Sequence, residues 1–439
     1  MMISVGRSRS SIRREKVPST AMMLQAGQDD STNRGSKGIL AVIGSSIAIF
    51  WPGALIFGFP GVMAPYWMKT FHVGRGAIGN ILFFVLAAVG VFMFLVGRWQ
   101  EKFGIRRMIT AGAIICGLSV LIIAYASNLY MVYLWAFLTG TSSAFVYIPA
   151  VTTVQQWYPT KRGLVSGIVS LLFGLAAAIM SPLFRYMFES MGYVPMNLTV
   201  AVLALIIGII AAQFTEGPKT PPTPQPSVSS GQPKPPVIIR ESLTVRESLH
   251  TKSFWFLWLT WAFQGAAGIA MVTLSTAYGL SKGLAMDSAV VILTAFNITN
   301  GGSRLIMGFF SDIVGRNAAM SLTFLAAGGA YFLLPYVNTL IVLAFLAAVI
   351  GFAFGTLFAV SAPLAVDCFG LKHFGAVFGL VFTAYGFVSG ILGPSLSGYL
   401  LDITDGNFFI VFACLGIFCT LSAIFIRFVT PPRAKSPSF

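Results

Sequence analysis

The segment "GFFSDIVGR", residues 308–316, follows an apolar run and has a related copy earlier in the chain. The earlier copy is "GRWQEKFGIRR", residues 97–107, and in both an acidic residue lies between two glycines, with basic residues after the second glycine. The acidic residues of the two copies, Glu101 and Asp312, are 211 positions apart. Three more residues recur at an offset of 212, namely Gly167, Gly174 and Pro182. A matched loop and a matched glycine/proline frame at nearly one offset indicate two related halves.

The chain around these segments is too apolar for a water-soluble protein. Of its 439 residues 56% are hydrophobic and 9% are charged, and the mean hydropathy is +0.83. Soluble domains carry about 25% charged residues, so the chain is predicted to be embedded in a membrane. The four cysteines lie in apolar segments and form no CxxC pair or Cys/His cluster, so no disulfide, metal site or cofactor is predicted.

Twelve apolar runs are long enough to cross a bilayer as helices, which takes about 20 residues. The predicted spans are 38–66, 76–97, 107–127, 129–156, 163–186, 194–214, 254–279, 288–311, 317–337, 339–366, 374–400 and 407–429. A Pro/Ser-rich segment with a short amphipathic stretch, residues 215–253, divides them six and six. We therefore predict an all-α integral membrane fold of twelve transmembrane helices in two pseudo-symmetric six-helix bundles.

This division predicts five parts with a defined orientation. They are a basic N-terminal tail at 1–37, a bundle at 38–214, a linker at 215–253, a bundle at 254–429 and a tail at 430–439. Of the 28 Lys and Arg residues, 23 fall on the side of the N-terminus and four on the other side. The positive-inside rule then predicts a multi-pass protein of the cell (inner) membrane with both termini cytoplasmic. The same distribution explains the net charge of +15 without nucleic acid, and we expect a monomer in the lipid bilayer.

The repeated loop resembles the G-x-x-x-D-x-x-G-R loop of the major facilitator superfamily, which implies a twelve-helix transporter. The first copy departs from it, with Glu101 for Asp and Ile105 where Arg is usual. Two longer segments, "WYPTKRGLVSG" (157–167) and "NITNGGSRLIMGFFSDIVGR" (297–316), are similar to the oxalate/formate antiporter and monocarboxylate carrier branch. That resemblance implies transport of small organic anions, with Arg304 holding the substrate carboxylate and Tyr147 as a site residue.

Two positions depart from that branch. The oxalate exchanger uses a lysine in span 11, and Val381 stands at that place here. Mammalian monocarboxylate carriers place an aspartate four residues before the arginine, where this chain has Asn300. A single embedded cation suits a single carboxylate, so the sequence favours monocarboxylates over dicarboxylates.

Arg304 is the one basic residue that the predicted topology leaves inside a span. Burying an arginine in a membrane costs about 2.5–3.5 kcal/mol by insertion scales, and the guanidinium stays charged. None of the 13 acidic residues is predicted at mid-membrane, so a substrate carboxylate held by two parallel hydrogen bonds is the expected partner. Asn297, Asn300, Arg304 and Gly308 share one helical stripe, which is predicted to face the interior. The competing interpretation places the Arg304 head group at the membrane surface.

Aromatic side chains and the repeated loops supply the other candidate residues. Tyr147 and Tyr385 are expected to donate hydrogen bonds to the anion. An apolar box around a short alkyl group is expected from Phe57, Phe59, Phe354, Phe358 and Phe382. The loops are predicted to form a conformational latch on the cytoplasmic side, whose charges pair in one conformation and part in the other: Gly97, Glu101, Gly104, Arg106, Gly308, Asp312, Gly315 and Arg316.

Together these residues predict a secondary active transporter that moves small monocarboxylates, such as lactate, pyruvate or formate, by proton-coupled alternating access. Exchange of organic anions of the oxalate/formate type stays open as an alternative, because no embedded carboxylate is predicted to relay a proton. A transporter-like sensor is a more remote alternative, since the tail and linker are short for a signalling domain. An enzyme is not predicted, because no paired carboxylates, histidine cluster or nucleophile with its base lie in the spans.

Overall fold

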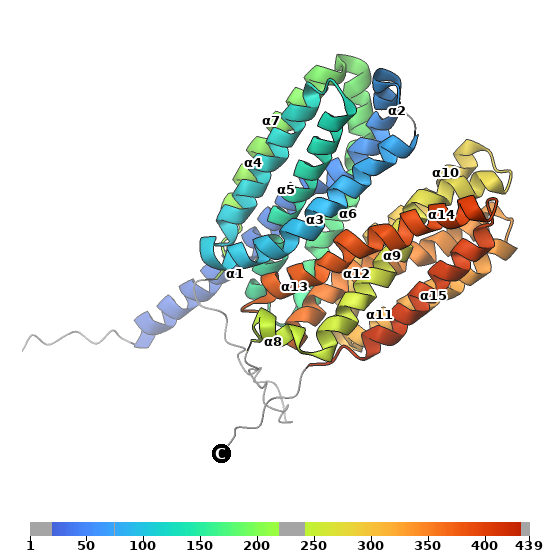
Figure 1. Ribbon diagram of the computed structural model, residues 1–439. Coiled ribbons are helices and arrows are strands. Elements are labelled where there is room, and N and C mark those ends of the chain that lie inside the picture. Colours follow the sequence, from blue (N-terminus) through green and yellow to red (C-terminus); the bar gives the residue numbers. More distant parts are fainter. Residues whose placement is uncertain (1–19, 74, 219–241, 432–439) are drawn as a thin grey trace, which may run out of the picture.

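The computed structural model describes residues 20–73, 75–218 and 242–431, and this part of the chain is helical without strands (Figure 1). Eleven helices in it are long and apolar enough to cross a membrane. The helix α10 (Met286–Val314) is not one of these eleven, and it carries the polar residues Asn297, Asn300 and Arg304. It packs against α12, α6 and α9, and it completes the twelve predicted spans.

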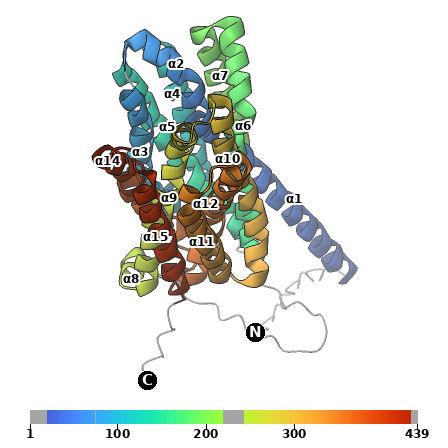
Figure 2. The ribbon, with the colours of Figure 1, turned by 90° about the vertical axis from the view of Figure 1, so that its right-hand side faces the viewer.

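The first half of the chain forms six spans in sequence order. The first span is bent and consists of α1 (Thr20–Gly53), the π-helical turn η1 (Ala54–Gly58) and α2 (Phe59–Phe71). The other five are α3 (Arg75–Phe103), α4 (Ile105–Ala124), α5 (Leu129–Trp157), α6 (Arg162–Met191) and α7 (Tyr193–Gln213). Helix α1 begins well before the predicted start of the first span, and its first part extends away from the bundle (Figures 1 and 2).

The second half also forms six spans in sequence order. Here the fifth span, not the first, is interrupted by π-helical turns. The helices of this half are α9 (Lys252–Ser281), α10, α11 (Arg316–Leu333) with η2 (Leu334–Tyr336), α12 (Leu340–Phe369), α13 (Phe374–Thr383), η3 (Ala384–Ser389), η4 (Ile391–Ser395), α14 (Leu396–Ile403) and α15 (Phe408–Arg427). The π-helical turns η3 and η4 lie in the eleventh span, where Pro394 cannot donate a backbone hydrogen bond. Ser389 Oγ donates to the carbonyl oxygen of Trp261 at 3.0 Å and so attaches η3 to α9.

The two halves touch at one end through paired glycines. A Cβ atom placed on Gly97 would lie 1.9 Å from the carbonyl oxygen of Gly375, and one on Gly163 would lie 2.2 Å from that of Gly308. Gly97 and Gly308 are 211 positions apart, and Gly163 and Gly375 are 212 apart. The contact of α3 with α13 is therefore the internal repeat of the contact of α10 with α6. This confirms the predicted fold of two pseudo-symmetric six-helix bundles.

We call the end where these glycines meet the basic end, because the turns after α3, α5, α10 and α12 lie there with their Lys and Arg residues. In Figure 1 the two groups of helices diverge toward the opposite end. Part of the predicted linker forms the short helix α8 (Val245–Leu249), which Thr244 and Glu247 cap reciprocally. Residues 219–241 of the linker and much of the two tails (1–19 and 432–439) lie outside the described residues, and the bounds of the five predicted parts stay a prediction.

Candidate functional site

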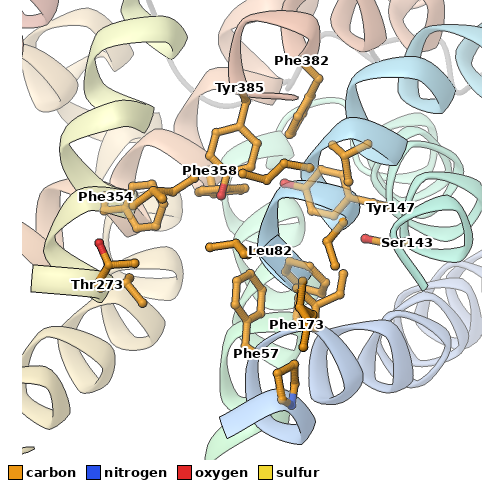
Figure 3. Close-up of a pocket in the computed structure, with 18 of the residues that line it drawn as sticks. Phe57, Leu82, Ser143, Tyr147, Phe173, Thr273, Phe354, Phe358, Phe382 and Tyr385 are labelled. Atoms are coloured by element: carbon orange, nitrogen blue, oxygen red, sulfur yellow. The ribbon is translucent and has the colours of Figure 1, made fainter. Parts of the chain in front are cut away.

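A cavity of about 250 Å³ lies between the two halves (Figure 3). Its walls come from the first span, α3, α5 and α6 on one side and from α9, α12, α13 and η3 on the other. Helix α3 contributes residues between Ile78 and Met93, and α9 contributes residues between Ile269 and Thr273. In both helices these residues lie away from the basic end, so the cavity belongs to the side where the halves diverge.

The lining of this cavity is almost entirely apolar. Polar side-chain atoms come from four of its lining residues, namely Ser143, Tyr147, Thr273 and Tyr385. Phenylalanines line the rest together with aliphatic side chains, and Phe57 and Tyr385 stand on the π-helical turns η1 and η3. Wide π-helical turns inside helices are frequent at functional sites. A ligand in this cavity would thus meet aromatic faces on most sides.

Arg304 lies buried beside this cavity, in the middle of α10, and is only 1% exposed. Its Nη1 donates to the carbonyl oxygen of Ser170 at 3.2 Å, and its Nη2 donates to Asn300 Oδ1 at 3.3 Å. Its Nε has no hydrogen-bond partner among the described residues. The head group is therefore in the bundle and not at a membrane surface, which rules out the competing interpretation for this conformation.

Two phenylalanine rings separate the guanidinium from the cavity. The Arg304 Cζ atom lies 4.6 Å from the centre of the Phe358 ring and 5.8 Å from that of the Phe173 ring. Such cation–π contacts are worth about 2 kcal/mol or more when they are shielded from water. They stabilise a buried cation for which the described residues supply no carboxylate partner.

The structure brings most of the predicted site residues together. Tyr147, Tyr385, Phe358 and Phe382 line the cavity, and Figure 3 shows the two tyrosine hydroxyls directed toward its centre. The Tyr147 hydroxyl is buried without a hydrogen-bond partner among the described residues. Arg304 and Asn300 lie behind this wall and do not line the cavity themselves.

Asn297 is a predicted site residue that the structure places neither at the cavity nor in the interior. It is exposed, whereas Arg304 and Gly308 on the same stripe are buried. Gly301 still faces Leu175 of α6, but one turn further along α6 Ile179 is 54% exposed. The helical stripe is therefore continuous, but the neighbouring helix no longer covers it at the level of Asn297.

Of the five phenylalanines predicted to form an apolar box, four line the cavity and one does not. Phe57, Phe354, Phe358 and Phe382 are lining residues. Phe59 is fully buried elsewhere, where its ring packs on Trp67, Trp135 and Phe184. Its inclusion in the box was wrong, because Phe57 and Phe59 lie two residues apart and so face different sides of the helix.

Sequence reasoning missed residues that the internal repeat identifies. Phe173 contacts Arg304, and its repeat equivalent 212 positions later is Tyr385. Met93 is the equivalent of Arg304 at an offset of 211, and it lines the cavity. A Cβ atom on Gly379 would lie 2.2 Å from the Met93 carbonyl oxygen, just as one on Gly167 would lie 2.5 Å from that of Arg304. The site thus has one cation, where perfect symmetry would have placed two.

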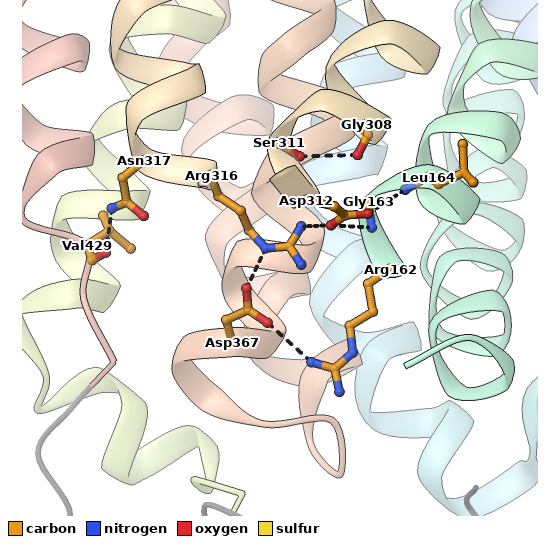
Figure 4. A network of polar contacts seen from close by, with 10 residues as sticks. All are labelled: Arg162, Gly163, Leu164, Gly308, Ser311, Asp312, Arg316, Asn317, Asp367 and Val429. Atoms are coloured by element: carbon orange, nitrogen blue, oxygen red, sulfur yellow. Dashed lines mark hydrogen bonds and ion pairs between the residues drawn. The ribbon is translucent and has the colours of Figure 1, made fainter. Parts of the chain in front are cut away.

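Beyond Arg304, the basic end is closed by an ionic network that crosses between the halves (Figure 4). Asp312 accepts hydrogen bonds from the backbone amides of Gly163 at 3.3 Å and Leu164 at 3.2 Å, at the first turn of α6. Arg316 pairs with Asp312 at 3.0 Å and also with Asp367. Arg162 of the first half pairs with Asp367 of the second half at 3.2 Å.

The first copy of the repeated loop makes a smaller connection. Glu101 contacts His373 of the second half, and its Oε1 atom lies 3.0 Å from His373 Nδ1, within hydrogen-bond distance. Arg106 does not cross between the halves, because its Nε donates to Gln213 of α7 at 2.9 Å. Gly104 and Gly315 have φ angles of 85° and 98°, which place the sharp turns that follow α3 and α10.

The Major Facilitator Superfamily model matches residues 46–295 and 283–439, and the chain belongs to this family of membrane transporters. It is therefore a transporter and not an enzyme.

The individual proteins to which the chain is similar share only a small fraction of identical residues with it. Over 290 residues the chain is 27% identical to the oxalate:formate antiporter of Oxalobacter formigenes, covering 66% of this chain and 67% of that protein. It is 23% identical to human monocarboxylate transporter 14, with 85% and 88% covered. The solved structure of FucP in the outward conformation has a TM-score of 0.68 at 13% identity, covering 90% of this chain and 99% of that one. At this identity the structural similarity concerns the fold alone.

Proposed function

We propose that the chain is a secondary active transporter of organic monocarboxylates, in which Arg304 binds the carboxylate. The observation that supports this most directly is the environment of Arg304. A cation that is 1% exposed and has no carboxylate partner in the described part of the chain calls for an anion from outside. The two named relatives that carry oxalate and formate or monocarboxylates in their names agree with this class of cargo.

The carboxylate would complete the hydrogen bonding of the guanidinium. Two of its nitrogens hold Ser170 and Asn300, and each terminal nitrogen has a second hydrogen to donate. Paired donation to a carboxylate is the strongest hydrogen bonding that an arginine offers. The hydroxyls of Tyr147 and Tyr385 add two donors on the cavity side. The Phe358 and Phe173 rings, which now cover the cation, would move aside as the carboxylate arrives.

The ionic network at the basic end would allow alternating access to the site. We propose that Asp312, Arg316, Arg162 and Asp367 hold the basic end closed while the cavity faces the other side. If the basic end is cytoplasmic, as the charge distribution predicts, this conformation faces outward. The reverse state would break these contacts and separate the paired glycines.

We propose proton-coupled symport as the mode of transport. Exchange of one organic anion for another is the second candidate, and a specific observation favours it. None of the described residues lining the cavity is an aspartate, glutamate or histidine that could carry the coupled proton. In symport the proton would have to travel with the cargo itself or through water.

Uptake of labelled lactate, formate and oxalate into proteoliposomes tests the proposal. An inward proton gradient should accelerate monocarboxylate uptake, and oxalate should be transported poorly because no second cation lines the cavity among the described residues, and Val381 stands where the oxalate exchanger has its lysine. Acceleration by internal anion without any effect of pH would favour exchange instead. Fast oxalate uptake would contradict the single-carboxylate site. Arg185→Gln is the matched control for Arg304→Gln in this assay, because it removes an exposed arginine at the opposite end.

A further inference from the structure

We infer that the preferred cargo is a monocarboxylate with an apolar body about as large as a phenyl ring, rather than formate, acetate or lactate. This inference rests on the proposed function, because it takes the anion at Arg304 as given. It concerns the part of the cargo that occupies the cavity, and it departs from the small organic anions that the resemblance to known carriers implies.

The size of the cavity is the first argument. A cavity needs only about 10–15 Å³ to hold one water molecule, so one of about 250 Å³ has room for many non-hydrogen atoms. Formate has three non-hydrogen atoms and lactate six, and three of these belong to the carboxylate that would lie beside Arg304. A small anion would leave most of the apolar cavity to water.

The chemistry of the walls is the second argument. Tyr147 and Phe382 meet at 5.6 Å between ring centres with an interplanar angle of 71°, and Phe358 and Tyr385 at 5.5 Å and 89°. These edge-to-face pairs leave both ring faces and ring edges directed into the cavity, which suits a further aromatic or branched aliphatic group. Phe57 and Phe354 extend the same surface farther from Arg304. A second charged group placed there would lose its water without finding a partner.

The direction of polarity along the cavity is the third argument. The Tyr147 and Tyr385 hydroxyls are directed toward the centre of the cavity in Figure 3, near the rings that cover Arg304. Ile269 and Val272, on the α9 wall, offer only aliphatic surface. The site is thus cationic at one end and mostly apolar along the rest, where the hydroxyls of Ser143 and Thr273 also line the cavity. Its best ligand therefore has a carboxylate and a largely apolar body.

Equilibrium binding to the purified full-length chain tests this inference, because passive permeation of lipophilic acids does not affect it. Acetate and phenylacetate carry the same carboxylate and differ by one phenyl ring. Burial of a phenylalanine-sized side chain favours the apolar site by about 10- to 150-fold. We therefore expect phenylacetate to bind about 10- to 150-fold more tightly than acetate, with 4-methylpentanoate in between, as measured by isothermal titration calorimetry.

The outcomes separate the two levels of the proposal. If acetate or lactate binds and phenylacetate binds no better, the cargo inference is overturned and the monocarboxylate site stands. If no carboxylate in the series binds, or if Arg304→Gln binds all of them as the unaltered protein does, the proposed function itself fails. The full expected result requires tight phenylacetate binding that depends on Arg304.

A substitution on the cavity wall gives a second test within one protein. Val272→Trp should fill the apolar part of the cavity and lower the ratio of phenylacetate to acetate affinity at least 10-fold. Val202→Trp is the matched control, because Val202 is 51% exposed on the outer surface of α7 and its substitution should leave the ratio unchanged. If Val272→Trp does not fold, Val272→Phe fills less space and should lower the ratio in the same direction. An unchanged ratio in a folded Val272 variant would overturn the inference.

Discussion

Asp312→Asn is the substitution that probes the closed basic end most sharply. The side chain keeps its size and one carbonyl oxygen, but it loses the negative charge that now faces the first turn of α6. In the structure that charge accepts hydrogen bonds from Gly163 and Leu164 and pairs with Arg316. We expect the closed conformation to become less favourable, because these backbone contacts join the two halves.

The size of the effect follows from the geometry of this site. A negative charge at a helix N-terminus is worth about 0.3–1 kcal/mol when exposed and up to ~2 kcal/mol when partly buried. The Asp312 side chain is 18% exposed, so the upper part of this range applies. Arg316 keeps its contact with Asp367 and needs no new partner. A loss of about 1–2 kcal/mol changes the ratio of closed to open molecules by a factor of about 5–30.

Double electron–electron resonance measures this ratio directly. Spin labels at Lys161 and Ile313, both exposed near the basic end, report the distance between the two halves. Glu189→Gln is the matched control, because it also removes one carboxylate charge, but from an exposed ion pair with Arg185 at the opposite end. The reasoning is refuted if Asp312→Asn leaves the short-distance population unchanged, or if Glu189→Gln shifts it equally.

Two further changes act on the same interface. Gly97→Ala should prevent closure of the basic end and reduce transport severely, because its Cβ atom would overlap backbone atoms of Gly375. The control is Gly398→Ala, whose Cβ atom would meet no atom within 4 Å and which should behave normally in the same uptake assay. His373 Nδ1 lies 3.0 Å from Glu101 Oε1 across the two halves, so His373→Ala should lower the closed population by a factor of about 1.5–5, as expected for a partly exposed polar pair. The same spin-label distances measure this change, and an unchanged closed population in the His373→Ala variant would contradict the assignment.

The organisation of the fold could be predicted from the sequence because it depends on local pattern. The length of the apolar runs sets the spans, and the matched loops at residues 97–107 and 308–316 reveal the two halves. Neither signal depends on how the side chains pack. The π-helical turns in the first and eleventh spans could not be placed in the same way, because prolines also stand in spans that stay α-helical, as Pro149 does in α5 and Pro182 in α6.

The site was predictable only in part, for a reason that Arg304 illustrates. Its burial follows from its place in an apolar span, and a single sequence can show that no acidic residue is near in the chain. The rings of Phe173 and Phe358 that cover it come from α6 and α12, and their approach depends on how three helices pack. Asn297 shows the opposite case, because helical periodicity gives the direction of a side chain but not whether another helix covers it.

The internal repeat carried more information about the site than the helical pattern did. Aligning the halves at offsets of 211 and 212 places Met93 opposite Arg304 and Phe173 opposite Tyr385. Both Met93 and Phe173 line the cavity. When one half of such a chain contains a recognised site residue, the equivalent residue of the other half is therefore the best additional candidate for the site.

The central claim is that Arg304 holds the carboxylate of the cargo, and the affinity of the Arg304→Lys variant for a monocarboxylate tests it most directly. Lysine keeps the positive charge but cannot donate in parallel to a carboxylate while also holding Ser170 and Asn300. Hydrogen bonds to charged groups contribute about 1.5–3 kcal/mol, so the affinity should fall about 10- to 150-fold. Arg185→Lys, with the same change at an exposed site, should bind normally. Unaltered affinity in a folded Arg304→Lys protein would contradict the account.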